Sequence, residues 1–346
     1  MIYFDVSRTL RAKHRSGLTR VGSRLLKEFG DTVKPVSLLV PGGGLSEASA
    51  QFHPSKDDWW LTPELFCEAE FPGLWTFFRK RRCRLAAVFH DAIPLKHPHI
   101  TWPQSVSRHP EYMRMLAEFD RVFAVSEASR QELLGFWRWQ GVEPRAVVET
   151  ISLGADFSGL PRVVRRGDAG RAALLCVGIL EPRKNQTFLL EVCESLWRDG
   201  FTFDLHLVGR VNPHFGQPVL TKVKALKKRY PGLRYHAAVD DETLARLLGE
   251  VRASVFPTIA EGCGLPLLES LWQGVPCLCS DLPVLRENAD AGGCLCVPVG
   301  ELERWREALR RVLTEAEAYA ELVRQTANRP LPSWADTAKA LAERLT

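Results

Sequence analysis

The residues best suited to chemistry lie in the stretch Phe256–Glu269, where two glutamates flank a Gly-Cys-Gly turn. Pro266 suits the first turn of a helix. Glycines let backbone N–H groups approach a ligand, and a helix start offers unpaired donors and a partial positive charge. This pattern predicts that Glu261 and Glu269 face a site for a phosphate or a sugar hydroxyl, formed by Gly262, Cys263, Gly264 and Leu265. The alternative is a capping Glu261 and a solvated Glu269.

Two adjacent cations, Arg183 and Lys184, form the second constellation, after an apolar run and a turn at Gly178. Arginine forks onto phosphate oxygens, and lysine supplies a point charge. The turn is not a Walker loop, which requires Gly-Lys-Ser/Thr, and Asn185 is a candidate helix cap. The pair is therefore either a phosphate site or a solvated pair before a helix.

Two further features lie in the first half of the chain. His90 ends an apolar run and precedes Asp91, so it is either a group that points into a cleft between domains or a core histidine. Asp91 could instead brace the loop before Pro94. Gly17 follows the polar segment that begins at Asp5, and it could let that loop approach a ligand.

The same element pattern recurs in both halves and would position these residues: a short apolar run, a turn marked by Gly or Pro, and an amphipathic helix. Such alternation indicates parallel sheets covered on both faces. Ligands of these sheets bind beyond the carboxyl ends of the strands. In the first half we expect strands at Ile2–Val6, Val36–Val40, Leu85–His90, Val122–Val125 and Val147–Ile151, with helices such as Arg20–Glu28 and Ser129–Trp137.

The second half has the more regular pattern, which predicts a second Rossmann-like domain. We expect strands at Ala173–Val177, Phe203–Val208, Ala253–Phe256, Val275–Cys279 and Gly293–Val297. Helices are expected near Thr187–Arg198, Val219–Lys228, Asp241–Gly249, Leu265–Gln273 and Leu302–Glu317.

Composition excludes several classes of protein. The 346 residues suffice for two domains, and 45% hydrophobic with 25% charged content is ordinary for a globular protein. A net charge of +5 argues against a nucleic-acid-binding protein. No apolar run is long enough to span a membrane, and Met1–Phe4 reads as a strand and not as a signal peptide, so a cytoplasmic location is expected.

The nine cysteines fit a reduced chain better than a disulfide framework. The pairs Cys277/Cys279 and Cys294/Cys296 lie in apolar runs without a neighbouring histidine, so core packing is expected and no metal site.

The basic excess falls before Arg166 and is concentrated in the run Arg79–Arg84. Trp75, Phe77 and Phe78 lie beside this run. It is either a weak contact for the inner face of an anionic membrane or for a lipid-diphosphate acceptor, or a solvated helix end. The polar segment Val163–Arg171 is the best linker. It divides the chain into domains 1–166 and 167–332.

Together these motifs resemble the GT4-type retaining glycosyltransferases. The setting Glu-Gly-x-Gly-Leu-Pro-x-x-Glu at Glu261–Glu269 carries the resemblance, with Gly-x-x-x-Pro-Arg-Lys-Asn at Gly178–Asn185. His90-Asp91-x-Ile-Pro, Val125-Ser126-Glu127-x-Ser129 and the Gly17 loop match in the same order. The helix expected at 333–346 resembles the final helix of the family, which packs back on the first domain.

The resemblance implies a GT-B architecture, with two Rossmann-like domains and a cleft between them. It implies that Arg183 and Lys184 neutralise a leaving diphosphate, that Glu261 and the 262–265 amides hold the donor sugar, and that Glu269 binds the ribose. His90 would approach the sugar. Three glycines, Gly17, Gly178 and Gly209, are assigned to donor binding.

The implied reaction transfers a sugar from a nucleotide-sugar donor to a hydroxyl of a glycan or lipid-linked glycan, with retention. The sequence has no Asp-x-Asp motif, so no metal and no other cofactor are expected. The style of the His90 motif is similar to bacterial mannosyltransferases of surface polysaccharide assembly, which favours GDP-mannose. UDP-glucose, UDP-GlcNAc, dTDP-rhamnose and a catalytically silent nucleotide-sugar-binding scaffold remain alternatives.

Two departures from the family pattern affect these assignments. Cys263 stands where an aromatic residue is common, and Ser152–Asp156 replaces the common Asn-Gly-Val-Asp. Neither departure touches the cations or the two glutamates.

Overall fold

The chain divides into two compact units in the computed structural model, which describes residues 1–9, 17–37, 53–156, 159–165 and 172–346. Unit 1 comprises Met1–Gly154 and Pro332–Thr346, and unit 2 comprises Ala155–Leu331. The division precedes the expected boundary at 166, because the segment before it bonds to unit 2: Arg162 donates to the Thr326 carbonyl at 2.9 Å. Residues 166–171 of the expected linker lie outside the described residues.

Unit 1 contains one sheet of parallel strands, with the order β2-β1-β3-β4-β5-β6 among the described residues. The strands are β1 (Ile2–Asp5), β2 (Val33–Val36), β3 (Trp59–Thr62), β4 (Arg84–Phe89), β5 (Arg121–Ala124) and β6 (Val147–Thr150). The α-helices are α1 (Gly17–Phe29), α2 (Leu74–Lys80), α3 (Ile93–Lys96), α4 (Pro103–Leu116), α5 (Glu127–Trp139) and α13 (Trp334–Arg344).

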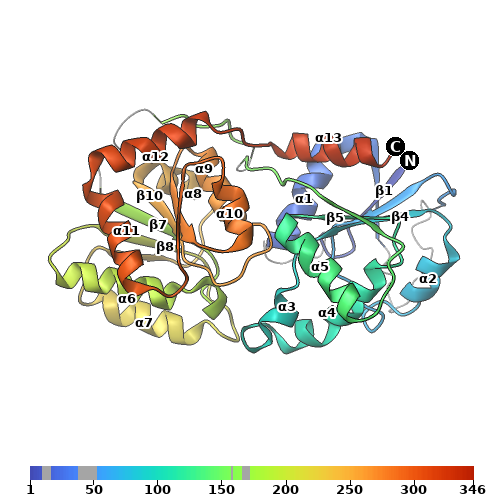
Figure 1. Ribbon diagram of the computed structural model, residues 1–346, viewed down its shortest axis with the longest axis horizontal. Coiled ribbons are helices and arrows are strands. Elements are labelled where there is room, and N and C mark those ends of the chain that lie inside the picture. The colour runs from blue at the N-terminus through green and yellow to red at the C-terminus, as the bar shows by residue number, and fades with distance from the viewer. Residues whose placement is uncertain (10–16, 38–52, 157–158, 166–171) are drawn as a thin grey trace. The chain divides into compact units, whose positions relative to one another are not determined.

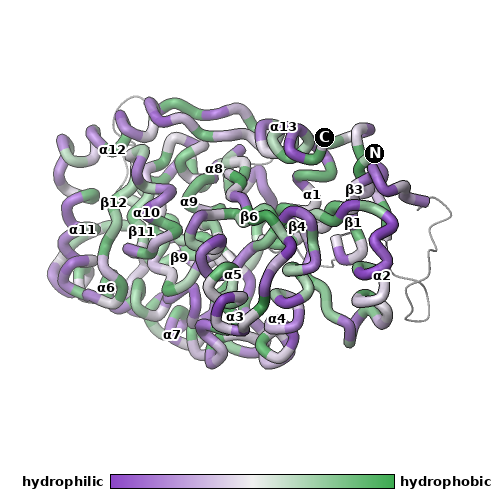
Figure 2. Tube along the Cα trace, turned by 45° about the vertical axis from the view of Figure 1, so that its right-hand side comes forward, coloured by the Kyte–Doolittle hydropathy of each residue, from purple (hydrophilic) through white to green (hydrophobic). Residues whose placement is uncertain are grey.

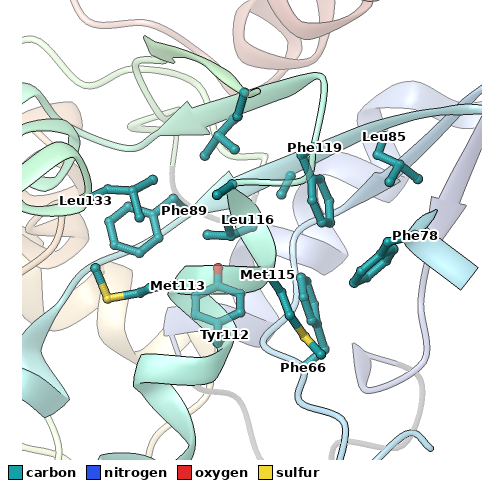
Figure 3. Packing of buried hydrophobic residues seen from close by; sticks show 14 of the residues in the cluster. Phe66, Phe78, Leu85, Phe89, Tyr112, Met113, Met115, Leu116, Phe119 and Leu133 are labelled. Carbon is teal, nitrogen blue, oxygen red and sulfur yellow. The ribbon is translucent and has the colours of Figure 1, made fainter. Parts of the chain in front are cut away.

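Aromatic side chains dominate the core of unit 1 (Figure 3). Phe66 stacks on Phe119 with ring centroids 5.8 Å apart, and Trp60 of β3 packs against Phe78 at 5.7 Å. No strand was predicted at β3. Trp60 of β3 and Phe78 of α2 have no exposed surface, because both elements direct these rings into the core.

The C-terminal helix α13 completes unit 1, where it lies beside α1 (Figure 1). Ser333 and Asp336 form a capping box at its start, which satisfies two backbone N–H groups. Trp334 is buried against Gly154, where a Cβ would lie 2.3 Å from the Trp334 nitrogen. The backbone approaches so closely that only glycine fits at 154.

Unit 2 also contains one parallel sheet among the described residues, with the order β12-β11-β10-β7-β8-β9. Its strands are β7 (Ala173–Val177), β8 (Asp204–Val208), β9 (Leu233–His236), β10 (Ala253–Phe256), β11 (Cys277–Ser280) and β12 (Cys294–Val297). Its α-helices are α6 (Gln186–Arg198), α7 (Gln217–Lys227), α8 (Asp241–Glu250), α9 (Leu265–Trp272), α10 (Pro283–Ala289), α11 (Leu302–Thr314) and α12 (Ala316–Asn328).

The predicted α/β class with parallel sheets is confirmed, but two expected elements differ from the structure. The single helix expected over Leu302–Glu317 is wrong, because Glu315 is extended and separates α11 from α12. Both helices alternate hydrophilic and hydrophobic segments (Figure 2), as helices packed on one side do. Strand β2 precedes the expected Val36–Val40, whose residues 38–40 lie outside the described chain, and β9 was missed.

The strand order creates a switch point in each sheet, where successive connections leave in opposite directions. The switch lies between β1 and β3 in unit 1, and between β7 and β10 in unit 2. Loops at a switch point diverge and leave room for a ligand beyond the strand ends. Among the described helices, none is both long and apolar enough to cross a bilayer.

Candidate functional site

The two constellations predicted in the second half meet at the switch point of unit 2. Arg183 and Lys184 follow β7, and Thr258 and Glu261 follow the neighbouring strand β10. The backbone joins the two loops, because the Ile259 N–H donates to the Arg183 carbonyl at 2.9 Å. Sheet topology thus brings together residues that are far apart in sequence.

One carboxylate oxygen is the centre of this site. Glu261 Oε1 accepts from Lys184 Nζ at 2.5 Å, from Arg183 Nη1 at 3.0 Å and from the Thr258 hydroxyl at 2.8 Å. Lys184 also lies 4.8 Å from the centre of the Phe256 ring. Both cations are therefore held in place before any ligand arrives.

The electrostatics of the cluster favour an ionised Glu261. Burial alone would raise the pKa of its carboxyl, but Lys184, Arg183 and the hydrogen bonds lower that pKa below its usual value. Burial lowers the pKa of the Lys184 ammonium, and Glu261 opposes that shift. The pair remains an ion pair, because each charge compensates the other where water is scarce.

A second carboxylate, Glu181, fixes the other side of the Arg183 guanidinium, and the sequence analysis did not identify it. Glu181 Oε1 accepts from Arg183 Nε at 3.1 Å, and its Oε2 accepts from Asn212 Nδ2 at 2.8 Å. The position of Glu181 just before Pro-Arg-Lys was a sequence signal for its contact with Arg183. No sequence signal pointed to Asn212, since it follows a different strand.

Asn185 is the N-cap residue of α6, as expected. Its side chain makes no capping hydrogen bond to α6; instead Asn185 adopts the left-handed conformation, at φ 56°. Asparagine tolerates that conformation better than most residues. The turn lets the chain enter α6 directly after the two cations.

The glycines of unit 2 allow close backbone approach. A Cβ at Gly209 would lie 1.9 Å from the Gly178 carbonyl oxygen, so the ends of β8 and β7 can meet only without it. Gly264 precedes α9 with φ 85°, and a Cβ there would lie 2.7 Å from Leu285. Gly178 and Gly209 thus shape the loop that carries the cations, while their assignment to donor binding stays a prediction.

The turn before α9 places its predicted residues as the sequence suggested. Pro266 lies in the first turn of the helix, next to Leu265. Gly262 is buried and Cys263 half-buried; burial raises the pKa of the Cys263 thiol to about 12, and the Cys263 carbonyl accepts from Asn288 at 2.5 Å. The Cys263 thiol is therefore not a thiolate at neutral pH.

Glu269 is buried in α9, so the alternative of a solvated helical residue is wrong. Its side chain lines a small cavity between the sheet and helices α8 and α9, with Leu244, Phe256 and Pro266. Both Glu261 and Glu269 raise the pKa of the Cys263 thiol through their charges. The two glutamates therefore act on the same turn.

The chain resembles known proteins in sequence and in fold. Residues 171–315 match the family model described as Glycosyl transferases group 1. The matched residues lie within unit 2. They include every site residue predicted in the second half.

Two curated relatives of Escherichia coli resemble the chain in sequence. It is 30% identical over 253 residues to the serotype-specific mannosyltransferase WbdA, which covers 68% of this chain and 31% of that protein. The matched part therefore spans about a third of the length of WbdA. The O-antigen chain mannosyltransferase B is 27% identical over 263 residues, 73% of this chain and 67% of that protein.

Solved structures share the fold at low sequence identity. HepE from Anabaena, determined in complex with UDP-glucose, has a TM-score of 0.72 at 13% identity, covering 99% of this chain and 98% of HepE. WaaG, a glycosyltransferase involved in lipopolysaccharide biosynthesis, has a TM-score of 0.62 at 15% identity, with both chains fully covered. The chain has the GT-B fold.

The remaining predicted site residues lie in unit 1, outside the residues that match the family model. His90 follows β4 and is buried, with Nε2 2.7 Å from the Pro63 carbonyl oxygen. A carbonyl only accepts, so Nε2 carries the proton, and burial lowers the pKa of the ring. His90 is therefore a neutral, positioned imidazole, and its part in catalysis stays a prediction. Asp91 accepts from the Ile93 N–H at 2.9 Å, which braces the loop.

Gly17 begins α1, and a Cβ there would meet nothing within 4 Å. The preceding loop residues, 10–16, lie outside the described residues. The structure thus places Gly17 at an exposed helix start, and its proposed contact with a ligand stays a prediction.

The basic run at 79–84 is partly used inside unit 1. Arg81 bonds to Asp120 at 3.1 Å, and Arg84 lies 4.5 Å from the Trp59 ring centre. Arg79 lies over Trp75 at 5.4 Å. Membrane contact through this run stays a prediction.

Proposed function

We propose that this chain is a glycosyltransferase whose unit 2 holds the diphosphate of a nucleotide-sugar donor. The observation that carries the proposal is the convergence of Arg183 and Lys184 on Glu261 at the switch point of unit 2. When the bond between sugar and diphosphate breaks, negative charge develops on the leaving group. Cations already fixed in a partly dry site stabilise that charge without reorganisation.

Each residue has a role in this proposal. Arg183 and Lys184 bind the diphosphate oxygens, and Glu261 with the amides of 262–265 holds the donor sugar. Glu269 binds the ribose hydroxyls, which suits a buried carboxylate beside a small cavity. A ribose-bound Glu269 is unavailable as a nucleophile.

Mannose from GDP-mannose is the first donor candidate, because the curated relatives are mannosyltransferases by name. The acceptor is a hydroxyl of a glycan or of a lipid-linked glycan. Transfer proceeds with retention and without a divalent metal, since the sequence has no Asp-x-Asp motif and the two cations serve the leaving group. The alternative donors are UDP-glucose, UDP-GlcNAc and dTDP-rhamnose.

A thermal-shift screen of GDP, UDP, dTDP and ADP sugars tests donor binding. The expected result is a rise in Tm with one nucleotide class, lost in Lys184→Ala and kept in Lys224→Ala, which removes an exposed lysine of α7. If no nucleotide sugar stabilises the wild-type protein, the donor site is refuted. A scaffold would bind the donor yet give no turnover with any acceptor.

Retention of configuration and metal independence each need a measurement on the active protein. The anomeric configuration of the product, determined by NMR, reports retention or inversion. Transfer after treatment with EDTA reports metal dependence, and a loss that Mg²⁺ or Mn²⁺ restores would overturn the metal-independent mechanism.

A further inference from the structure

A second group of charged residues lies at the switch point of unit 1, next to Pro63, whose carbonyl bonds to His90. Asp5 ends β1 and is followed by Ser7 and Arg8, and Thr62 ends the neighbouring strand β3 and is followed by Glu64. Ligands bind at such points in open parallel sheets. The question is therefore which chemistry this cluster presents.

Two buried carboxylates fix the backbone of the cluster. Asp5 accepts from the Ser7 hydroxyl at 2.5 Å and from the Thr62 hydroxyl at 2.8 Å. Glu64 accepts from the backbone N–H of Arg8 at 2.5 Å and of Thr9 at 2.6 Å. The chain leaving β1 is thereby fixed just where the Arg8 side chain begins.

Two guanidinium groups then converge on one carboxylate. Arg8 and Arg108, the latter from α4, both form ion pairs with Glu70. Arg8 also lies 5.8 Å from the centre of the Phe71 ring. The side chains of Arg8 and Arg108 are 41% and 37% exposed. One carboxylate cannot use all the N–H donors of two guanidiniums, so the pair retains both donors and charge for a ligand.

The neighbouring acids reduce this positive charge less than their number suggests. Burial raises the pKa of Asp5. Burial, and then the charge of Asp5, raise the pKa of Glu64 to about 7. Glu64 is therefore partly protonated at neutral pH, and it lines a common cavity with Asp5, Ser7 and Phe71. Carboxyl groups with raised pKa values at the ends of strands are characteristic of functional sites.

We propose that Arg8 and Arg108, braced by Glu70, form an anion subsite in unit 1 that binds a phosphate-class oxyanion carried by the acceptor. The assignment to the acceptor rests on the proposed glycosyltransferase function; the anion subsite itself does not. Two planar guanidiniums fixed by a shared carboxylate suit the oxygens of a phosphate better than two free lysines, because less side-chain freedom is lost on binding.

Inorganic pyrophosphate, titrated by calorimetry, tests the subsite. The wild-type protein is expected to bind it at two independent sites, one in each unit. The double change R8Q/R108Q should weaken pyrophosphate binding at the unit 1 site about tenfold or more, because charge-assisted hydrogen bonds are lost. The site in unit 2 remains and is lost instead in Lys184→Ala.

The control R114Q removes an exposed arginine of the same helix α4 and should leave both sites intact. Circular dichroism and Tm establish that each variant folds. If R8Q/R108Q is folded and both sites persist, or if the wild-type protein has only the Lys184-dependent site, the proposal is overturned. A wild-type protein that binds pyrophosphate in unit 1 but binds no nucleotide sugar would refute the proposed function and leave the subsite standing.

Flotation with vesicles distinguishes the sources of the oxyanion. Salt-sensitive binding to vesicles of phosphatidylglycerol in phosphatidylcholine that R8Q/R108Q abolishes and R114Q retains assigns the subsite to a lipid-borne phosphate. Vesicle binding that is absent in the wild-type protein, with pyrophosphate binding intact, assigns it to a soluble phosphate ester.

Discussion

Replacing Glu261 by glutamine separates two roles of the cation cluster, which are binding of the diphosphate and promotion of sugar transfer. The change keeps the size of the side chain but removes the charge that three donors share at Oε1. Arg183 and Lys184 lose their common counter-ion, while Glu181 still holds Arg183. We expect Glu261→Gln to bind the nucleoside diphosphate product more tightly and to transfer the sugar more slowly.

The magnitude follows from the charge at the site. At an effective dielectric constant of about 20, a carboxylate about 5 Å from a diphosphate oxygen repels it by about 3 kcal/mol. Screening by the two cations and by water leaves about 1.4 kcal/mol, which is about a tenfold lower Kd for the diphosphate. Transfer falls about a hundredfold or more, as when one preorganised electrostatic group is removed from an active site.

The assay measures Kd for the nucleoside diphosphate selected by the thermal-shift screen, and kcat for transfer. Glu317→Gln, an exposed glutamate in the first turn of α12, is the matched control. A diphosphate that binds Glu261→Gln no more tightly than the wild-type protein would falsify the competition between Glu261 and the ligand.

Glu261→Gln should also change how the unfolding free energy depends on pH. The folded state lowers the pKa of Glu261, so its ion pairs contribute stability above the unfolded carboxyl pKa of about 4.3. That contribution is lost as pH falls through the lower pKa of the folded state. The difference in unfolding free energy between wild type and Glu261→Gln should therefore shrink below about pH 4.

Three other changes test separate parts of the structure. Lys184→Met keeps the buried stem but removes the ammonium, so kcat for transfer should fall about 10²–10³-fold, with weaker diphosphate binding by calorimetry. Gly209→Ala places a Cβ 1.9 Å from the Gly178 oxygen and should cost about 3 kcal/mol or more in urea unfolding, whereas Gly249→Ala, with nothing within 4 Å, should not destabilise. The pKa of Glu64 is raised to about 7, so the folded state retains a proton that the unfolded chain releases. Wild-type unfolding free energy should then fall by about 1–3 kcal/mol from pH 5 to 8, and Glu64→Gln should show no such fall.

Strands with mainly apolar runs could largely be predicted from the sequence, whereas a strand interrupted by charged residues could not. β7 and β10 have the predicted bounds, and both lie inside the sheet with mainly apolar residues. β9 is an edge strand in which Arg234 and His236 interrupt the apolar pattern. β3 was missed although it lies inside the sheet and all four of its residues are buried.

The charged residues of the unit 2 site were identified separately, but their convergence could not be read from spacing. Arg183 and Glu261 are 78 residues apart, and they meet because β10 pairs with β7 and not with the strand before it in the chain. Asn212 contributes through a side-chain amide whose partner depends on where its loop runs. Strand order, which no local pattern encodes, therefore decides the composition of the site.

Helix α13 affects the order in which this protein forms during translation. Residues 1–154 of unit 1 leave the ribosome before unit 2, yet the surface around Gly154 stays uncovered until Trp334 emerges. Unit 2 is continuous in sequence and is synthesised completely before that helix emerges. Nascent chains should thus hold a finished second unit beside an incomplete first one, which makes the uncovered face of unit 1 the natural place for chaperones to bind.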